Sequence, residues 1–361
     1  MTLLLRNEAD ILDAHLAYHL AAGVDFVVAT DHRSDDGSSE ILERYSQAGV
    51  VHVVREESQR MRQSDWVTRM ARQAAALGAD WVINSDADEF WWPRGGNLRD
   101  VLAAVPEEYG AIWSFDVPFV ARPEDGRAFW ERMTVALTPQ APINDPASIF
   151  RPLPRIVHRA SPDVVVGIGS HSLLAGGLAE LHWWMPIEAF HFPIRSVAQV
   201  GPKAAAHVEA FSSPGSRVGN AYHERAFREA AEGRAGRYYA TVAVSDDELA
   251  EGVAAGCLVE DTRLRDALRS LQQPGGGGFR PAPELRDALS FGPPTVEEAV
   301  RNAVAAATWA EASLVRVRRR ADLLERRFGA IERSSLAARA ARRRRGLPQA
   351  RSGRGVAVVA E

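Results

Sequence analysis

Cysteine is almost absent from this chain of 361 residues, and so are long apolar runs. The single cysteine, Cys257, excludes an intrachain disulfide and any metal cluster built on several cysteines. No apolar stretch approaches the roughly 20 residues that a membrane-spanning helix needs. The short apolar run at residues 2–5 follows no basic residue and is too short for a signal peptide. These absences predict a soluble protein of the reducing cytoplasm.

A strong excess of one charge is also lacking, because the net charge is −4. This balance argues against nucleic acid as a partner. The average hides an asymmetry, since residues 316–354 carry 14 arginines against three acids. Basic runs such as Arg342–Arg345 are usually solvated, and attraction to the anionic inner face of a membrane is the alternative. Hydrophobic residues make up 46% of the chain, which is enough for a sizeable core and excludes global disorder.

The first 120 residues alternate between short apolar segments and longer amphipathic ones. This alternation predicts a Rossmann-like α/β fold, in which a mostly parallel sheet is flanked by helices on both faces. The expected strands are residues 2–5, 26–29, 50–54, 81–83 and 111–115, and the expected helices are residues 9–22, 38–48, 65–77 and 98–105.

The regular alternation is lost after residue 117, where prolines, aromatics and basic residues increase. We expect this part to add an antiparallel extension to the sheet on the substrate side. Its short candidate strands are residues 156–157, 164–168, 172–174 and 188–192.

Composition divides the chain into four predicted segments. Residues 1–245 form the sheet domain, and residues 246–290 contain a helix over 246–271 followed by a Gly/Pro-rich linker. Residues 291–345 form a long amphipathic helix, and residues 346–361 form a disordered tail.

The long C-terminal helix carries apolar residues at alternating intervals of three and four positions. This heptad pattern is typical of a coiled coil, so self-association into a homo-oligomer is one interpretation. Packing of the helix on its own domain is the other. The apolar positions are Val300, Ala303, Ala307, Ala310, Leu314, Val317, Ala321, Leu324, Phe328 and Ile331.

Two aspartates one residue apart, Asp86 and Asp88, directly follow the fourth expected strand. Open parallel sheets bind ligands beyond the carboxyl ends of their strands. Carboxylate oxygens there suit a hard divalent cation, which gives its remaining positions to water and phosphate. A solvated turn is the alternative. However, Glu89 follows at once, and three adjacent acids repel one another unless a cation or basic groups compensate. The pattern favours a site for a phosphate-bearing substrate.

Two further polar loops follow neighbouring strands and should reach the same edge of the sheet. Arg6, Asn7 and Glu8 follow the first strand, and the loop that begins with Asp31 follows the second. A loop rich in Ser, Asp and Gly also serves to cap a helix. Beside an acid pair, however, Asp31 is suited to accept a hydrogen bond from a base or ribose.

In this order, the motifs resemble those of the family 2-like glycosyltransferases of the GT-A fold. The acid pair with its trailing Glu89-Phe90 looks like their Asp-x-Asp motif. The match covers roughly residues 2–210, although His32-Arg33 stand where that family often has Asn-Gly. The segments that carry the resemblance are residues 5–12, 18–25, 31–38, 81–90, 167–171 and 190–196, with Lys203 beyond them.

The resemblance implies roles for individual residues in binding a nucleoside-diphosphate sugar. Asp31 would contact the base or ribose, and Arg6, Asn7 and Glu8 would lie nearby. Asp88 would ligate Mn²⁺ or Mg²⁺ across the diphosphate, while Asp86 would contact the ribose or the metal and its water shell.

Three residues of the later segments would complete the site by the same resemblance. His191 would be a further metal ligand or a diphosphate contact, and Arg195 and Lys203 would face the diphosphate. As alternatives, His191 could be a buried histidine bonded to the backbone, and the two cations could be ordinary surface charges.

The implied reaction is inverting transfer of a hexosyl group from a UDP- or GDP-sugar to a glycan, lipid or protein acceptor. A carboxylate or imidazole would take the proton of the acceptor hydroxyl. The base signature of the family is not visible, and the candidates in the irregular half are Asp163, His171 and Glu180. The competing interpretation is a non-catalytic coiled-coil scaffold that carries a degenerate GT-A domain.

Overall fold

The computed structural model divides the chain into two units, Met1–Ala310 and Glu311–Glu361. The residues that the structure describes all belong to the first unit, and they are residues 1–59, 61–138, 141, 150, 153–181, 185–211 and 221–272. The predicted linker, long helix and tail lie outside the described residues.

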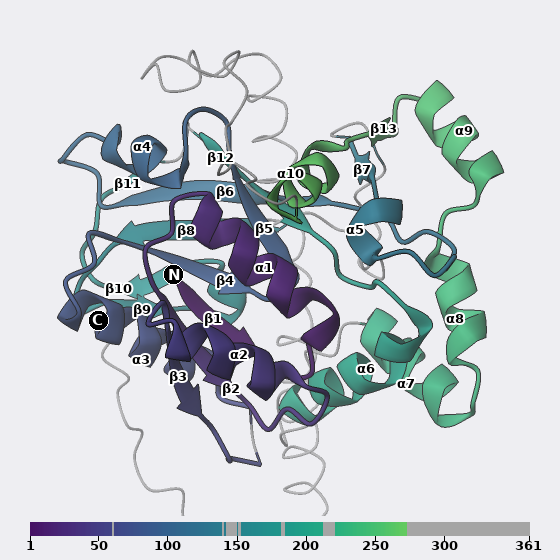
Figure 1. The fold of residues 1–361 in the computed structure, drawn as a ribbon, viewed down its shortest axis with the longest axis horizontal. Coiled ribbons are helices and arrows are strands. Elements are labelled where there is room, and N and C mark those ends of the chain that lie inside the picture. Colours follow the sequence, from purple (N-terminus) through teal and green to yellow (C-terminus); the bar gives the residue numbers. More distant parts are fainter. Residues whose placement is uncertain are drawn as a thin grey trace, which may run out of the picture. The chain divides into compact units, whose positions relative to one another are not determined.

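A mixed sheet of nine strands runs through the described part of the chain (Figure 1). The strand order is β3-β2-β1-β4-β8-β6-β12-β5, and β11 pairs with β6. These strands are β1 (Thr2–Leu5), β2 (Val27–Asp31), β3 (Val51–Arg55), β4 (Trp81–Asp86), β5 (Glu89–Pro93), β6 (Ala111–Pro118), β8 (Pro154–Arg159), β11 (Glu180–Leu181) and β12 (Ile187–His191).

The first half of the sheet has the predicted parallel arrangement. β1 pairs in parallel with both β2 and β4, and β2 pairs in parallel with β3. β8 then runs antiparallel between β4 and β6, and β5 runs antiparallel to β12. The mostly parallel sheet is therefore confirmed. The later strands are not purely antiparallel as predicted, because β6 pairs in parallel with both β12 and β11.

Helices cover both faces of the sheet. α1 and α2 lie in front of it in Figure 1, where α10 lies near α1, and α3 packs on the opposite face. The helices are α1 (Ala9–Ala21), α2 (Ser38–Gln47), α3 (Gln63–Ala76), α4 (Leu98–Ala103), α5 (Phe129–Arg132), α6 (Val197–Phe211), α7 (Ala221–Ala231), α8 (Ala235–Val242), α9 (Asp246–Ala254) and α10 (Arg263–Gln272).

Helix α3 shows why the sequence folds in this way. Trp66, Met70 and Ala74 recur at helical spacing and are buried against Leu4 of β1 and Val82 of β4. A parallel sheet covered on both faces needs strands that are apolar on both faces, and β1 and β2 are buried along their whole length. This packing fixes where the carboxyl ends of β1, β2 and β4 lie.

The sequence pattern predicts one helix over residues 246–271. The structure instead has two helices there, α9 and α10, with a strand between them. Gly256, at φ +72°, lies just after the end of α9. The next residues form β13 (Leu258–Glu260), which pairs antiparallel with β7 (Val135–Leu137). Leu264 and Leu268 of α10 are buried in the same core as the sheet, so this segment belongs to the sheet domain.

Two shorter strands complete the described elements. β9 (Val165–Val166) and β10 (Leu173–Ala175) form an antiparallel pair over α3, close to the predicted strands 164–168 and 172–174. In the described part of the chain, no helix is both long enough and apolar enough to cross a bilayer.

Candidate functional site

The acid pair lies in a tight turn between two strands. β4 ends at Asp86 and β5 begins at Glu89, which leaves Ala87 and Asp88 in the turn. The buried side chain of Glu89 folds back and accepts a hydrogen bond from the backbone N–H of Asp86 at 3.2 Å. The position of the two aspartates is therefore fixed by strand pairing on both sides and by a side-chain bond beneath the turn.

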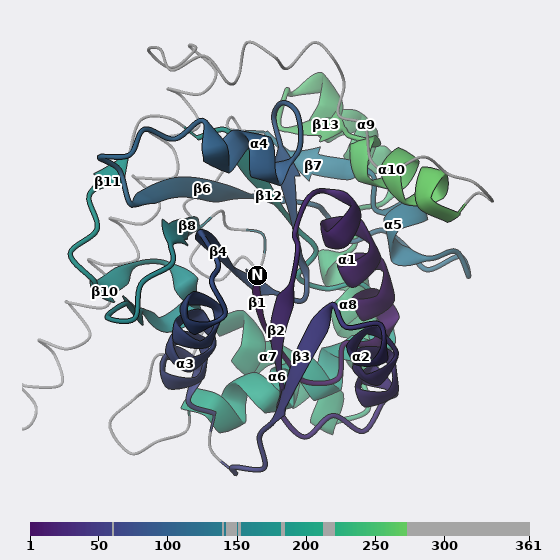
Figure 2. The same cartoon turned by 60° about the vertical axis from the view of Figure 1, so that its left-hand side comes forward.

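A pocket of about 400 Å³ opens beside this turn, at the carboxyl ends of β1 and β4. Figure 2 shows α6 and α7 below the ends of the parallel strands, and both helices contribute to its wall. The predicted site residues that line it are Arg6, Glu8, Asp86, Asp88 and Lys203. The other described lining residues are Leu4, Leu5, Met61, Arg62, Gln63, Ser64, Asp65, Ala87, Ile168, Ala206, His207 and His223.

Asp88 lies close to two basic side chains, Lys203 and His191. The ammonium group of Lys203 contacts its Oδ2, and Nε2 of His191 lies 3.6 Å from the same oxygen. Burial raises the pKa of Asp88, but the ion pair with Lys203 and the nearby His191 outweigh this effect and hold the pKa well below its usual value. Asp88 is consequently an anion throughout the neutral range.

Asp86 and Glu8 behave differently from Asp88. Burial raises the pKa of Asp86, against the opposing field of Arg155. Burial also raises the pKa of Glu8, although Arg195 and Lys203 lower it. Nζ of Lys203 lies 3.9 Å from Oε1 of Glu8. The same ammonium group therefore faces two carboxylates, that of Glu8 after β1 and that of Asp88 after β4.

Arg195 lies behind the pocket and is not among its lining residues. Its side chain is fully buried and pairs with Glu8 and, through Nε at 2.8 Å, with Asp10. A further donor of the guanidinium bonds to the carbonyl oxygen of Phe192 at 3.1 Å. This placement favours a supporting role, in which Arg195 fixes Glu8, over the predicted direct contact with a diphosphate.

A buried arginine that sequence reasoning missed lies beneath the acidic turn. Arg155 of β8 pairs with Glu89, and its Nε lies 3.0 Å from Oδ1 of Asp116 on β6. Asp116 also lies 3.6 Å from Nδ1 of His191, so His191 stands between two carboxylates and outside the pocket lining. The only sequence signal for Arg155 is a basic residue directly before the expected strand 156–157.

The remaining predicted nucleotide contacts organise their own loops. Asn7, at φ +58°, accepts from the N–H of Asp35 and donates through Nδ2 to the Asp35 carboxylate. Asp31 is buried and accepts from the N–H of Ser34 at 3.1 Å, from Ser39 and from Arg55 at 3.3 Å. Neither residue is among those that line the pocket.

The three base candidates lie away from the pocket lining. Asp163 is exposed, and its backbone N–H bonds to Ser161. Nδ1 of His171 lies 2.7 Å from the carbonyl oxygen of Pro154, and Glu180 accepts from the indole N–H of Trp113 at 3.1 Å. The structure therefore does not bring these three residues to the acid pair.

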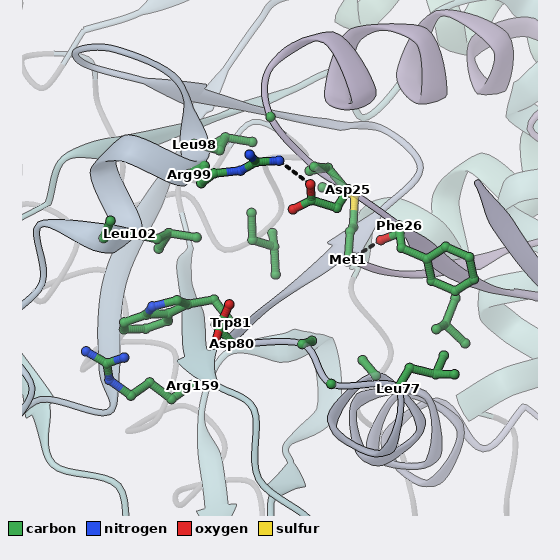
Figure 3. Close-up of a pocket in the computed structure, with 18 residues that line it drawn as sticks. Met1, Asp25, Phe26, Leu77, Asp80, Trp81, Leu98, Arg99, Leu102 and Arg159 are labelled. Atoms are coloured by element: carbon green, nitrogen blue, oxygen red, sulfur yellow. Dashed lines mark hydrogen bonds and ion pairs between the residues drawn. The ribbon is translucent and has the colours of Figure 1, made fainter. Parts of the chain in front are cut away.

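A larger cavity of about 690 Å³ lies at the opposite edge of the sheet, where the parallel strands begin (Figure 3). Asp25 pairs with Arg99 at this cavity, and the Met1 amino group donates to the carbonyl oxygen of Phe26 at 2.8 Å. The predicted site residues do not line it. The smaller pocket, which gathers the acids and Lys203, is therefore the candidate functional site.

The chemistry of the donor set fits a hard divalent cation that takes few protein ligands. Asp86 and Asp88 bring two carboxylates to one pocket. Within the described ranges, no three His, Cys, Asp or Glu side chains are grouped so as to hold a metal ion. A cation here would therefore need water and phosphate oxygens, and Lys203 would compete with it for Asp88.

One family model matches the chain. Residues 4–165 match glycosyltransferase family 92, a stretch that runs from β1 into β9 and includes the acidic turn. The match supports a glycosyltransferase, the class implied by the sequence resemblance. The match does not support the more specific assignment to family 2, and it does not support metal binding by the Asp-x-Asp motif. No curated protein matches the chain.

Solved structures of the S. aureus protein TarS share a distant similarity with this chain. TarS 1–349 is 14% identical, with 63% of this chain and 68% of that chain covered and a TM-score of 0.32. The same fragment in complex with UDP-GlcNAc is 13% identical, with 63% and 70% covered and a TM-score of 0.33. Similarity at this level does not define the fold or the ligands of the present chain.

Proposed function

We propose that this protein transfers a hexosyl group from a UDP- or GDP-sugar to an acceptor, with Mn²⁺ or Mg²⁺ bound at Asp86 and Asp88. The observation that carries the proposal is the gathering of both aspartates with Glu8 and Lys203 in one pocket at the carboxyl ends of β1 and β4. The match to a glycosyltransferase family model over residues 4–165 supports it.

The transfer is a single displacement with inversion at the anomeric carbon. The oxygen of the acceptor hydroxyl forms a bond to this carbon and gives its proton to a carboxylate or imidazole base. The bond to the diphosphate oxygen breaks, and its electron pair leaves on the diphosphate. The cation would stabilise that developing charge as a Lewis acid. Lys203, held by Asp88 and Glu8, is the protein cation placed to stabilise the same charge.

The charge states of Asp88 and Lys203 suit binding of a cation and a diphosphate. The low pKa of Asp88 keeps it ionised for ligation. Burial lowers the pKa of Lys203, but Asp88 and Glu8 outweigh burial and raise it, so the ammonium group stays charged at neutral pH. Arg195 keeps Glu8 in place from behind.

The experiment that tests the function uses the full-length chain and a donor panel of UDP-glucose, UDP-galactose, UDP-N-acetylglucosamine and GDP-mannose. Titration calorimetry measures binding, and release of nucleoside diphosphate measures slow transfer to water, each with Mn²⁺, Mg²⁺ or chelator. We expect one donor to bind and to be hydrolysed only with the metal. If no donor binds under any condition, the scaffold interpretation is favoured.

Lys203 and the metal compete for the same carboxylate, which predicts an unusual gain of binding. Lys203→Met removes the charge that compensates Asp88 and Glu8, so Mn²⁺ should bind about tenfold more tightly without nucleotide. Electron paramagnetic resonance of free Mn²⁺ measures this affinity directly. Lys203→Arg, which keeps the charge, is the matched control and should stay near wild type. Weaker Mn²⁺ binding by Lys203→Met would contradict the assignment of Asp88 as a ligand.

A further inference from the structure

Two histidines outside the predicted set form a stacked pair in the wall of the pocket. His207 of α6 and His223 of α7 have ring centroids 3.6 Å apart and planes inclined by 22°. Both line the pocket that contains Asp86 and Asp88. Lys203 lies four residues before His207, so the two side chains project from the same face of α6.

The surroundings keep both rings neutral in the free protein. Burial, aided by Lys203, lowers the pKa of His207 to about 4. Burial, His207 and Lys203 lower the pKa of His223 to about 2, while Asp88 raises it slightly. The ring of Tyr222 on α7 is tilted by 43° to that of His223, with centroids 4.2 Å apart. Tyr238 of α8 lines a small adjoining cavity together with Lys203 and His223.

Apart from the proposed divalent cation, the pocket has few positively charged side chains to balance an incoming diphosphate. Arg6 at its edge pairs with Glu209, and Arg62 pairs with Asp65. Lys203 is already shared between Asp88 and Glu8. A bound diphosphate would bring negative charge to the histidine pair, and an adjacent anion stabilises imidazolium and raises the pKa of the pair. Stacked imidazoles repel when both are charged, so the pair takes one proton as a unit.

We propose, on the basis of the proposed function, that His207 and His223 form the phosphate-contacting wall of the pocket and together take up one proton when a nucleoside-diphosphate sugar binds. The proton comes from solvent and is released with the product. Because the bound state holds the extra proton, donor affinity rises as pH falls and decreases as pH rises through the pKa of the bound pair.

Calorimetry in buffers of different ionisation enthalpy counts the protons. The donor from the panel that binds is titrated at pH 7 in PIPES, HEPES and Tris, since its diphosphate diester has no group that titrates near this pH. We expect uptake of about one proton and a donor affinity that falls by up to tenfold per pH unit on the alkaline side. His207→Gln should remove the uptake and flatten this pH dependence.

Controls separate this inference from the proposed function. His52→Gln, an exposed histidine on β3, should keep the full proton uptake. Melting temperatures show whether His207→Gln is folded, and the wild-type measurement decides the question even if the variant is not. Binding of the donor without proton uptake would overturn this inference but not the proposed function. The same would hold if His207→Gln took up as many protons as wild type. Failure of every donor to bind would overturn the proposed function with it.

Discussion

Asp88→Asn is expected to lower metal-dependent donor turnover by at least about a thousandfold. Asparagine keeps the shape of the side chain but removes the charge that Lys203 contacts and that the proposed divalent cation would bind. The fold should survive, because strand pairing and Glu89 hold the turn. Nucleoside diphosphate release measures turnover, and thermal unfolding measures the fold.

The matched control for this variant is Asp25→Asn. Asp25 is an exposed aspartate at the opposite edge of the same sheet, where it pairs with Arg99. Its turnover should equal that of wild type. Metal-dependent binding of the donor by Asp88→Asn with unchanged affinity would remove Asp88 from the cation site. Stabilisation of the leaving group would then be assigned to Lys203 and the protonated histidine pair, without the metal.

The parallel half of the fold could be predicted from the sequence because its signals are local. Trp66, Met70 and Ala74 define one face of a helix by their spacing alone, and short apolar runs make up residues 3–5 of β1 and residues 27–29 of β2. The positions of Asp86 and Glu8 then follow from the rule that parallel strands end at one edge. Both residues do line one pocket in the structure.

The antiparallel half and much of the site could not be predicted because they depend on long-range pairing. β5 is an apolar aromatic segment whose strand character comes from β12, about a hundred residues later. Arg155 of β8 pairs with Glu89 of β5, and no local pattern joins these two residues. His207 and His223 meet only because α6 packs against α7. The resemblance predicts Arg195 as a diphosphate contact, and the sequence does not show that its side chain lies behind Glu8 instead.

Removal of Arg155 should cause the largest loss of stability of any single substitution considered for the site. Arg155 is buried and pairs with Glu89 and Asp116, which are buried themselves. Arg155→Met fills similar space but leaves two buried carboxylates without their cation. Breaking such a pair costs about 3–5 kcal/mol, and for a unit of this size the melting temperature should fall by about 10 °C.

The effect of Arg155→Met should depend on pH in a defined direction. Burial raises the pKa of Glu89 well above its usual value, with Arg155 opposing the shift, and burial raises that of Asp116 in the same way. The folded state therefore binds more protons than the unfolded state, and stability falls as pH rises above the unfolded pKa values. Without Arg155 both pKa values rise further. The loss of stability should thus be small near pH 4.5 and should grow toward pH 8.

Urea unfolding at several pH values between 4.5 and 8 measures this dependence. Arg44→Met is the matched control, because Arg44 and Asp13 form an exposed pair at 2.8 Å. Exposed pairs contribute about 0–1 kcal/mol, so this variant should unfold close to wild type at every pH. A constant loss for Arg155→Met across the pH range would mean that it arises from packing. The acidic turn would then not depend on the Arg155 charge, and the support of Asp86 through Glu89 would have to come from strand pairing alone.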